Sequence, residues 1–342
     1  MHPLIEKAAV AIAELNMIAR FIPNKDLFLY MYVRKEALLS SQIEGTQSSL
    51  SDLMLFESQQ IPQTSVDDVE EVSNYVCALN YGIQRLSEGF PLSLRLIREI
   101  HAILLRGGRG SQKQPGEFRR SQNWIGGTRP GNALFVPPPP EDLMDILGNF
   151  ELFLHDKTSH PLIKAGLAHV QFESIHPFLD GNGRMGRLLM VLILYNEGLL
   201  RETVLYLSLY FKQNQTAYYS LLQETRLEGR WETWLEFFLN GAYEMTRHAI
   251  DKISAIQKLF EECDKKIQKL GRLRFSAIPV FEFLQKNLQT DVSTLARALN
   301  ISPPTARKVL NLFVKAKIIA EISGLKRDKV YRFDRLLSLL EE

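Results

Sequence analysis

The chain has 342 residues with 41 Lys or Arg against 39 Asp or Glu, which gives a net charge of +2. Hydrophobic residues make up 45% of the chain and charged residues 23%, a balance typical of a soluble globular protein. This composition excludes a disordered chain, a collagen-like chain and a disulfide-rich scaffold. The near-neutral total also argues against a protein that is basic throughout, although it permits a local basic patch.

Cysteine usage and the lack of a long apolar run indicate the compartment. Cys77 and Cys263 lie far apart and neither belongs to a CxxC pair, so we expect no thiolate zinc site and a reducing environment. The longest apolar run, residues 188–195, is far shorter than the about 20 residues that a bilayer span needs. The N-terminus carries acidic residues and lacks a signal-like cleavage site. We therefore expect a cytoplasmic protein with no membrane partner.

Apolar residues recur at helical intervals over most of the first 228 residues. In the second helix Leu27, Met31 and Leu38 carry the pattern, and Gly45 supplies a C-terminal stop. Pro91 suits the first turn of the fourth helix. The predicted helices are residues 3–20, 24–41, 66–86, 91–105, 141–155, 161–175, 184–197 and 216–228.

Residues 106–140 interrupt this pattern because they are rich in Gly and Pro. Within them, Phe118–Ile125 and Ala133–Val136 are predicted to pair as a hairpin around Gly126–Asn132. The four prolines 137–140 form a stiff spacer after it.

The last hundred residues follow the order of a winged helix. A charged connector helix over 247–270 precedes short helices at 278–288 and 292–299. Ser302 is placed to cap a third helix that has Pro303 in its first turn and runs to about Lys315. Two strands, 318–322 and 330–333, are then predicted around residues 323–329.

The most informative segment is His176-Pro-Phe-Leu-Asp-Gly-Asn-Gly-Arg-Met-Gly-Arg187, between two predicted helices. A glycine-rich turn that enters a helix presents backbone N–H groups to an anion, and the helix dipole adds positive charge there. Arg184 and Arg187 project from the first turns, and guanidinium groups suit phosphate oxygens. Asp180 is a natural Mg²⁺ ligand beside bound phosphates, and His176 can accept a proton from a hydroxyl.

This local chemistry predicts attack of a substrate hydroxyl on a nucleotide phosphate. The alternative is a segment without catalytic function: a simple turn before an amphipathic helix, with a structural histidine. The combination of His, Asp, Asn and two Arg at this spacing favours the functional interpretation.

The same segment resembles the Fic family signature, H-x-F-x-[D/E]-G-N-G-R-x-x-R, and matches every fixed position. The resemblance extends over roughly residues 20–240. It implies a mainly α fold, a Fic-type helical bundle with a β-hairpin flap, followed here by a small winged helix-turn-helix domain. We expect N-terminal helices including an inhibitory helix over 1–90, the Fic core over 91–245, a connector over 246–272 and the winged helix over 273–342.

The resemblance implies a protein adenylyltransferase that moves AMP from ATP to a Ser, Thr or Tyr hydroxyl of a target protein and of itself. His176 matches the base that deprotonates this hydroxyl, and Phe178 the apolar anchor of the loop. Arg184 matches the residue that holds the α- and β-phosphates, and Arg187 the one that reaches the γ-phosphate. The nucleotide site would comprise Asp180, the Mg²⁺ ligand, with Gly181, Asn182, Gly183, Arg184, Met185, Gly186 and Arg187.

Three further residues are assigned to the nucleotide by the same resemblance. Ile125 in the hairpin would lie over the nucleotide, and the hairpin would pin the target segment by strand-like pairing. Tyr218 and Tyr219 resemble residues that line an adenine pocket, although consecutive tyrosines point in different directions and one of them can belong to the core.

Ser40-Ser-Gln-Ile-Glu44-Gly45 resembles the Fic inhibitory motif, [S/T]-x-x-x-E-[G/N]. At a helix end the Glu44 carboxylate meets the negative pole of the helix dipole, which costs about 0.3–1 kcal/mol unless a cation offsets it. In the family this Glu pairs with the second signature Arg, here Arg187, and withholds it from the γ-phosphate. The resemblance therefore implies autoinhibition by Glu44, with Ser40 and Gly45 in the motif. The alternative is an exposed Glu at a helix end.

Residues 291–342 hold ten Lys or Arg and six Asp or Glu, a net charge of +4. Basic side chains on the third helix and on the wing suit contacts with DNA phosphates, and the competing interpretation is a protein-binding winged helix with a solvated basic face. These side chains are Arg307, Lys308, Lys315, Lys317, Lys326, Arg327 and Lys329. Relatives often self-associate, so a homodimer is also expected.

Alternative functions stay open at this point. The inhibitory Glu of some relatives orients a water that removes AMP, which would make this a two-way AMPylase and deAMPylase. A DNA-associated regulator with a weakly active Fic domain is the second alternative, and the intact His176 argues against it. Fic domains also transfer UMP, phosphate or phosphocholine, although the inhibitory Glu favours ATP. The target protein is not named by any feature of the sequence.

Overall fold

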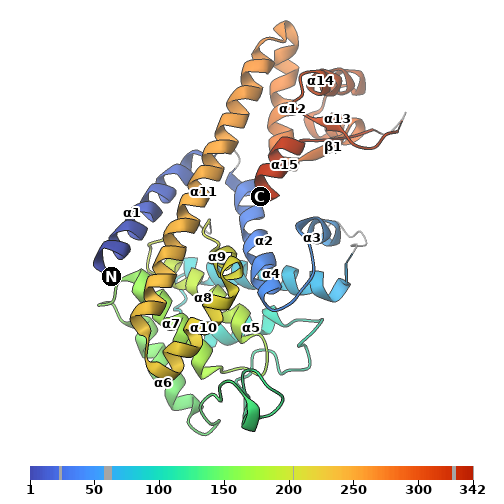
Figure 1. Cartoon of the computed structure of the whole chain (residues 1–342). Helices are drawn as coiled ribbons and strands as arrows, with labels where there is room; N and C mark the ends of the chain where they lie inside the picture. Colours follow the sequence, from blue (N-terminus) through green and yellow to red (C-terminus); the bar gives the residue numbers. More distant parts are fainter. Residues whose placement is uncertain (23–24, 58–63, 203, 326–328, 342) are drawn as a thin grey trace. The chain divides into compact units, whose positions relative to one another are not determined.

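A computed structural model describes residues 1–22, 25–57, 64–202, 204–325 and 329–341. It divides into two compact units. The first comprises Met1–Asn16 and Tyr32–Arg247, and the second Met17–Met31 and His248–Glu342. The fold is mainly helical, as predicted (Figure 1).

The helices follow the predicted order closely up to residue 268, with additional short ones. They are α1 His2–Ile18, η1 Ala19–Phe21, α2 Lys25–Ile43, α3 Leu50–Glu57, α4 Val66–Ser87, α5 Leu94–Leu104, η2 Pro130–Asn132, α6 Leu143–His155, α7 Pro161–Ile175, α8 Asn182–Asn196, α9 Leu207–Gln213, α10 Gln215–Glu228 and α11 Trp231–Gln268. Leu27 lies in α2, but its side chain is outside the described set.

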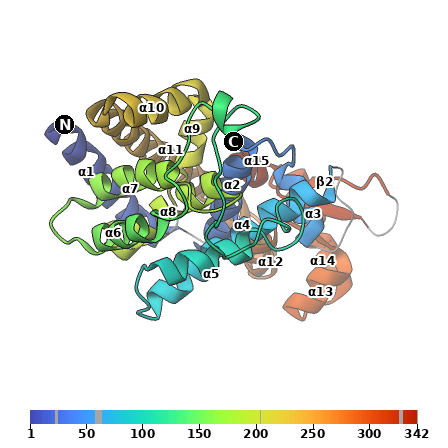
Figure 2. The same ribbon diagram turned by 90° about the horizontal axis from the view of Figure 1, so that it is seen from below.

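The core of the first unit is built around α8, which packs along α7 and also touches α4 and α5 (Figure 2). The run from Met185 to Leu194 is buried without a break and is apolar apart from Gly186 and Arg187, which explains this central place, because a helix that is buried on all sides needs neighbours on all sides. The N-terminus of α8 lies across a short junction from the end of α7. This junction is the signature segment.

Up to residue 268, two helix starts differ from the sequence prediction by more than two residues. Pro91 is not in the first turn of α5, because the side chain of Ser93 accepts a hydrogen bond from the backbone N–H of Leu96 and caps a helix that begins at Leu94. The connector helix expected from Arg247 is the second half of α11, which begins at Trp231. Gly241 lies inside α11 without interrupting the helix. The ring of Tyr210 packs against it, and a Cβ at this position would lie 2.5 Å from that ring.

The predicted hairpin is reduced to one antiparallel bridge, between Ile125 and Phe135. The extended pairing expected over Phe118–Ile125 is wrong, because the backbone N–H of Arg119 and the side chains of Arg119 and Asn123 donate to carbonyls of the signature loop instead. The turn also contains a 3-10 segment, Pro130–Asn132, in which the Asn132 side chain accepts from the N–H groups of Thr128 and Arg129. We call residues 118–136 the flap.

The second unit contains a small three-stranded antiparallel sheet with the order β1-β3-β2. Its helix α14 starts as predicted, with Ser302 as the cap and Pro303 in the first turn. The strand β1 and the helix α15 were not predicted. The elements are α12 Arg274–Asn287, β1 Gln289–Asp291, α13 Val292–Leu299, α14 Pro303–Lys315, β2 Ala320–Glu321, β3 Val330–Arg332 and α15 Asp334–Glu341.

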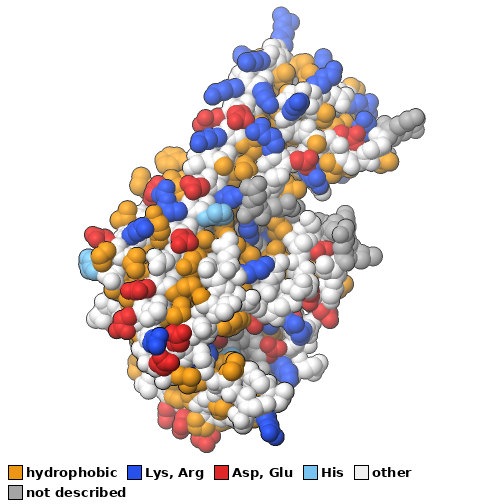
Figure 3. Space-filling view, viewed as in Figure 1, with side chains coloured by type: hydrophobic (Ala, Val, Ile, Leu, Met, Phe, Trp, Pro, Cys, Tyr) orange, Lys and Arg blue, Asp and Glu red, His pale blue; other side chains and the backbone are white. Residues whose placement is uncertain are grey.

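Lys and Arg side chains gather on the face of the second unit that Figure 3 shows. Arg307 and Lys308 are exposed on α14, whereas Lys329 lies 3.6 Å from the carboxylate of Glu321. Lys326 and Arg327, which were expected on the wing, lie outside the described residues. Among the described helices, none is both long and apolar enough to span a membrane.

Candidate active site

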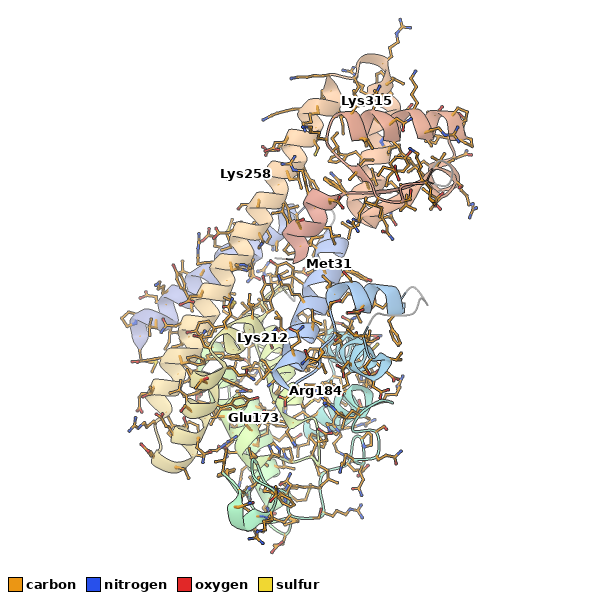
Figure 4. The ribbon with its side chains drawn as sticks, turned by 45° about the vertical axis from the view of Figure 1, so that its right-hand side comes forward. Met31, Glu173, Arg184, Lys212, Lys258 and Lys315 are labelled. Carbon is orange, nitrogen blue, oxygen red and sulfur yellow. The ribbon has the colours of Figure 1, made fainter. Side chains whose placement is uncertain are left out.

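The signature loop connects the C-terminus of α7 to the N-terminus of α8, and Figure 4 marks Glu173 and Arg184 on these two helices. His176 caps α7 in the left-handed conformation, with φ +49° and ψ +58°. That conformation is unfavourable for a residue with a Cβ, so the surrounding contacts must hold it. The helix α7 therefore ends at His176, the predicted base.

Phe178 and Asn182 fix the shape of the loop. The buried Phe178 ring stacks on the imidazole of His101, with 3.6 Å between ring centroids and 4° between planes. The amide of Asn182 donates to the carbonyl of Phe178 at 2.8 Å and accepts from its N–H at 2.9 Å. The predicted anchor role of Phe178 agrees with this packing. Asn182 acts as an internal clamp through its side chain.

His176 is placed to remain neutral. Burial lowers the pKa of its imidazole to about 4, and the positive charges of Arg226 and Arg119 act in the same direction. The ring atom Nδ1 lies 3.3 Å from the carbonyl oxygen of Glu173. A proton on Nδ1 satisfies that contact and leaves Nε2 as an acceptor. A neutral imidazole with a free acceptor is the state that a general base requires.

The N-terminus of α8 has the features expected of an anion site. Gly181, with φ +75°, precedes the helix, and Gly183 lies in its first turn. The Asp180 carboxylate accepts from the N–H of Gly181 at 2.6 Å and lies 3.8 Å from the Arg184 guanidinium. Its side chain is 36% exposed. One accessible carboxylate beside an anion site fits Mg²⁺, which is held by one or two carboxylates and the substrate phosphates.

Arg187 is engaged by the C-terminal end of α2. Its Nε donates to the hydroxyl of Ser40 at 2.9 Å, and its Nη2 donates to the Ser40 carbonyl at 2.9 Å and to Oε1 of Glu44 at 2.7 Å. Burial alone would raise the pKa of Glu44, but the charge and hydrogen bond of Arg187 outweigh it and hold that pKa below its usual value. Gly45 follows with φ +98°, so a glycine suits the turn.

Glu44 also occupies the anion site itself. A Cβ at Gly183 would overlap Oε1 of Glu44, so this carboxylate lies directly on the first turn of α8. The carboxylate therefore covers the helix N-terminus at which the sequence predicts a phosphate.

Arg184 is held by a carboxylate that the sequence did not single out. Its Nη1 donates to Oε2 of Glu71 at 2.9 Å, and both side chains are 2% exposed. Glu71 lies on α4 and also pairs with Arg109, whose Nε is 2.9 Å from Oε1. Burial raises the pKa of Glu71, while the two guanidinium groups oppose that shift. Glu71 therefore links the signature to α4 and to the loop after α5.

Glu173 is a second buried carboxylate beside the site. Its Oε2 lies 3.9 Å from Nδ1 of His176, and a Cβ at Gly186 would lie 2.8 Å from its Oε1. Burial raises the pKa of Glu173 to about 7, against the lowering effect of Arg187 and Arg226. Gly186 is thus a close-packing residue, and Met185 is buried in the core.

The two tyrosines point in different directions. Tyr218 is buried and its hydroxyl lies 2.8 Å from Nε2 of His169, whereas Tyr219 is 45% exposed. Ile125 is half-buried at the single bridge of the flap. The nucleotide contacts assigned to these three residues stay predictions.

The chain is similar to known proteins of one family. The profile of the Fic/DOC family N-terminal region matches residues 2–84, and the profile of the Fic/DOC family matches residues 91–194. Curated proteins named "Protein adenylyltransferase Fic" from Drosophila virilis and Drosophila melanogaster are each 33% identical over 196 residues, 56% of this chain. The chain spans only 37% of the length of these relatives.

Solved structures show the same fold. A Fic family protein from Desulfovibrio desulfuricans aligns with a TM-score of 0.59 and 22% identity, covering 97% of this chain and 96% of its own. Fic-1 from C. elegans, residues 134–508, aligns with a TM-score of 0.59 and 24% identity, covering 74% of this chain and 72% of its own. The matching profiles, the intact signature and the fold lead to one conclusion: this chain belongs to the Fic/DOC family.

Proposed function

We propose that this chain is a protein adenylyltransferase that transfers AMP from ATP to a Ser, Thr or Tyr hydroxyl of a protein, and that the described conformation is its restrained form. The contact between Glu44 and Arg187 carries the proposal. It supports the proposal because an internal carboxylate lies on the first turn of α8 beside two buried arginines, where the proposal places a phosphate of ATP. The names of the curated relatives support AMP as the transferred group.

The chemistry requires one proton transfer and one displacement. His176 accepts the hydroxyl proton at Nε2 as the hydroxyl oxygen attacks the α-phosphorus. The bond between that phosphorus and the oxygen bridging to the β-phosphate breaks, and pyrophosphate leaves. Arg184, Arg187 and the N–H groups of α8 stabilise the negative charge that develops on the phosphate oxygens. Asp180 would hold Mg²⁺, which neutralises phosphate charge when bound.

The donor is tested with the Glu44→Gly variant and ATP labelled at either the α- or the γ-phosphate. We expect label on protein from α-labelled ATP alone. Label from the γ-position would indicate a kinase, and label from neither, with UTP or a phosphocholine donor active instead, would move the proposal to another donor.

Removal of AMP by the same site is the second candidate. The charges of Arg184 and His176 both lower the pKa of Glu44, so its carboxylate lies near both groups. A carboxylate in that place is able to orient a hydrolytic water. Modified protein incubated without ATP should then lose AMP only when Glu44 is present.

Four further features stay predictions: residence in the cytoplasm, modification of the chain itself, a homodimer, and DNA contact through residues 291–342. Exposed Arg307 and Lys308 on α14 support the last of these. A salt-sensitive shift of duplex DNA in a gel, lost in an Arg307→Glu/Lys308→Glu variant, is the expected result.

A further inference from the structure

Two flap side chains hold the backbone carbonyl of His176. Nε of Arg119 and Nδ2 of Asn123 each donate to this oxygen at 3.0 Å. Asn123 also donates to the carbonyl of Phe178 at 3.0 Å, and the backbone N–H of Arg119 donates to the carbonyl of Pro177 at 2.9 Å. The three consecutive signature carbonyls 176–178 therefore all bind the flap.

Arg119 is a buried cation in an unusual environment. It is 2% exposed, and each hydrogen bond that the described residues make with its guanidinium ends on a backbone carbonyl. Two of these carbonyls, of Ile175 and His176, lie at the C-terminus of α7. Helix C-termini carry negative partial charge, which compensates the buried guanidinium. The carbonyl of Pro138, at 2.5 Å, ties the other edge of the group to the end of the flap.

Asn123 is oriented by its two acceptors. Its amide cannot be reversed, because the side-chain oxygen would then face two carbonyl oxygens. Nδ2 of Asn123 thus binds the residues on both sides of Pro177, His176 and Phe178. His176 is the residue with the left-handed backbone conformation. The direction of the imidazole depends on that backbone conformation.

We propose that Asn123 and Arg119 are positioning residues for His176, so that the flap fixes the base. This inference rests on the proposed function, because it assigns the flap a role in the same transfer. Ile125, at the bridge, lies two residues beyond Asn123. The segment expected to hold the target therefore also aligns the group that deprotonates it.

The neighbouring amide provides a matched control. Nε2 of Gln122 donates to the carbonyls of Asn123 and Pro137 at 2.9 and 3.0 Å, both within the flap or its end. Gln122→Ala and Asn123→Ala thus each remove two hydrogen bonds between a side-chain amide and the backbone. Only the second removes contacts with the signature loop. Asn123→Asp keeps the shape and replaces the donor by an acceptor.

The variants are made in the full chain carrying Glu44→Gly, and kcat and KM for ATP are measured with melting temperatures. We expect Asn123→Ala to lower kcat by about tenfold to a hundredfold, the range for a slightly misplaced catalytic group, with KM for ATP unchanged. Asn123→Asp should lower kcat further and Arg119→Lys should also lower it. Gln122→Ala, which keeps every contact with the signature loop, should lower it less than Asn123→Ala. Equal kcat values for the Asn123 and Gln122 variants would overturn the inference.

A second readout separates this inference from the proposed function. The His176 ring resonance, assigned by its loss in His176→Ala, should shift in both Asn123 variants and stay in place in Gln122→Ala. An active parent with an unmoved His176 resonance and unchanged kcat refutes the positioning role. A parent that transfers no AMP refutes the proposed function, and the resonance alone then decides whether the flap positions His176.

Discussion

Oε1 of Glu44 accepts a 2.7 Å hydrogen bond from Nη2 of Arg187, a guanidinium that is 1% exposed. The Glu44 side chain is 33% exposed. Under the proposed restraint, withdrawal of Glu44 is the simpler way to release Arg187, because Glu44 is the more accessible of the two partners.

Glu44→Gly should raise AMP transfer. A charge-assisted hydrogen bond contributes about 1.5–3 kcal/mol, which corresponds to about tenfold to a hundredfold more Arg187 available to the nucleotide. Initial rates with α-labelled ATP measure this. Glu88→Gly is the control, since Glu88 also ends a helix and faces an arginine, Arg85, at 3.7 Å. Equal rates for the two variants would contradict the inhibitory role.

Glu71→Gln should destabilise the fold by about 1–3 kcal/mol, because Arg184 is buried and loses its charged partner. Arg109→Gln removes the other partner of Glu71, but the Arg109 side chain is 52% exposed, so its loss should cost about 1 kcal/mol or less. Urea unfolding of both variants gives the comparison. The ranking fails if Arg109→Gln is the more damaging change.

Glu173 should make stability depend on pH. Its pKa is raised from 4.5 to about 7 in the folded chain, so the native state retains a proton that the unfolded state releases. This contribution is fully present below pH 4.5 and is lost as the pH rises through about 7. Glu173→Gln removes the titration. The free energy of unfolding of the variant minus that of the wild type should therefore increase by about 1–3 kcal/mol between about pH 5 and about pH 8.

Parallel stability curves for the wild type and Glu173→Gln across this range would show that the carboxyl is already ionised in the folded chain. Comparing a difference at two pH values cancels any constant effect of the substituted amide.

Asp180→Asn should abolish the response of AMP transfer to Mg²⁺. In the Glu44→Gly background we expect at least about a hundredfold loss of rate, because the metal supplies several kcal/mol of charge stabilisation. A magnesium titration at fixed ATP measures it. Asp145→Asn, at an exposed position of α6, is the control. A variant at Asp180 that keeps the parental magnesium curve would exclude this carboxylate as the ligand.

The candidate site was predictable where it is local. Twelve consecutive residues carry His176, Asp180 and both arginines, so their closeness follows from the sequence. Their orientation depends on contacts with residues distant in the chain. The link from Glu44 to Arg187 came from the inhibitory motif, and the hydrogen bond confirms the pairing.

Glu71 was not predicted, because its partner is distant in the chain. A signal existed: it shares the buried stripe of α4 with Val72, Tyr75 and Ala78, where a charged residue needs a partner. The flap was predicted as two paired strands for a similar reason, since two short stretches around a Gly-rich turn do not reveal that Arg119 and Asn123 bind the signature loop.

The most direct test is intact-mass spectrometry after incubation with ATP and Mg²⁺. A model hydroxyl-bearing protein and this chain are analysed together, using Glu44→Gly and Glu44→Gly/His176→Ala. The restrained-transferase account predicts an added mass of one AMP with the first variant and none with the second. An AMP adduct that forms equally well without His176, or an adduct of a different mass, would contradict it.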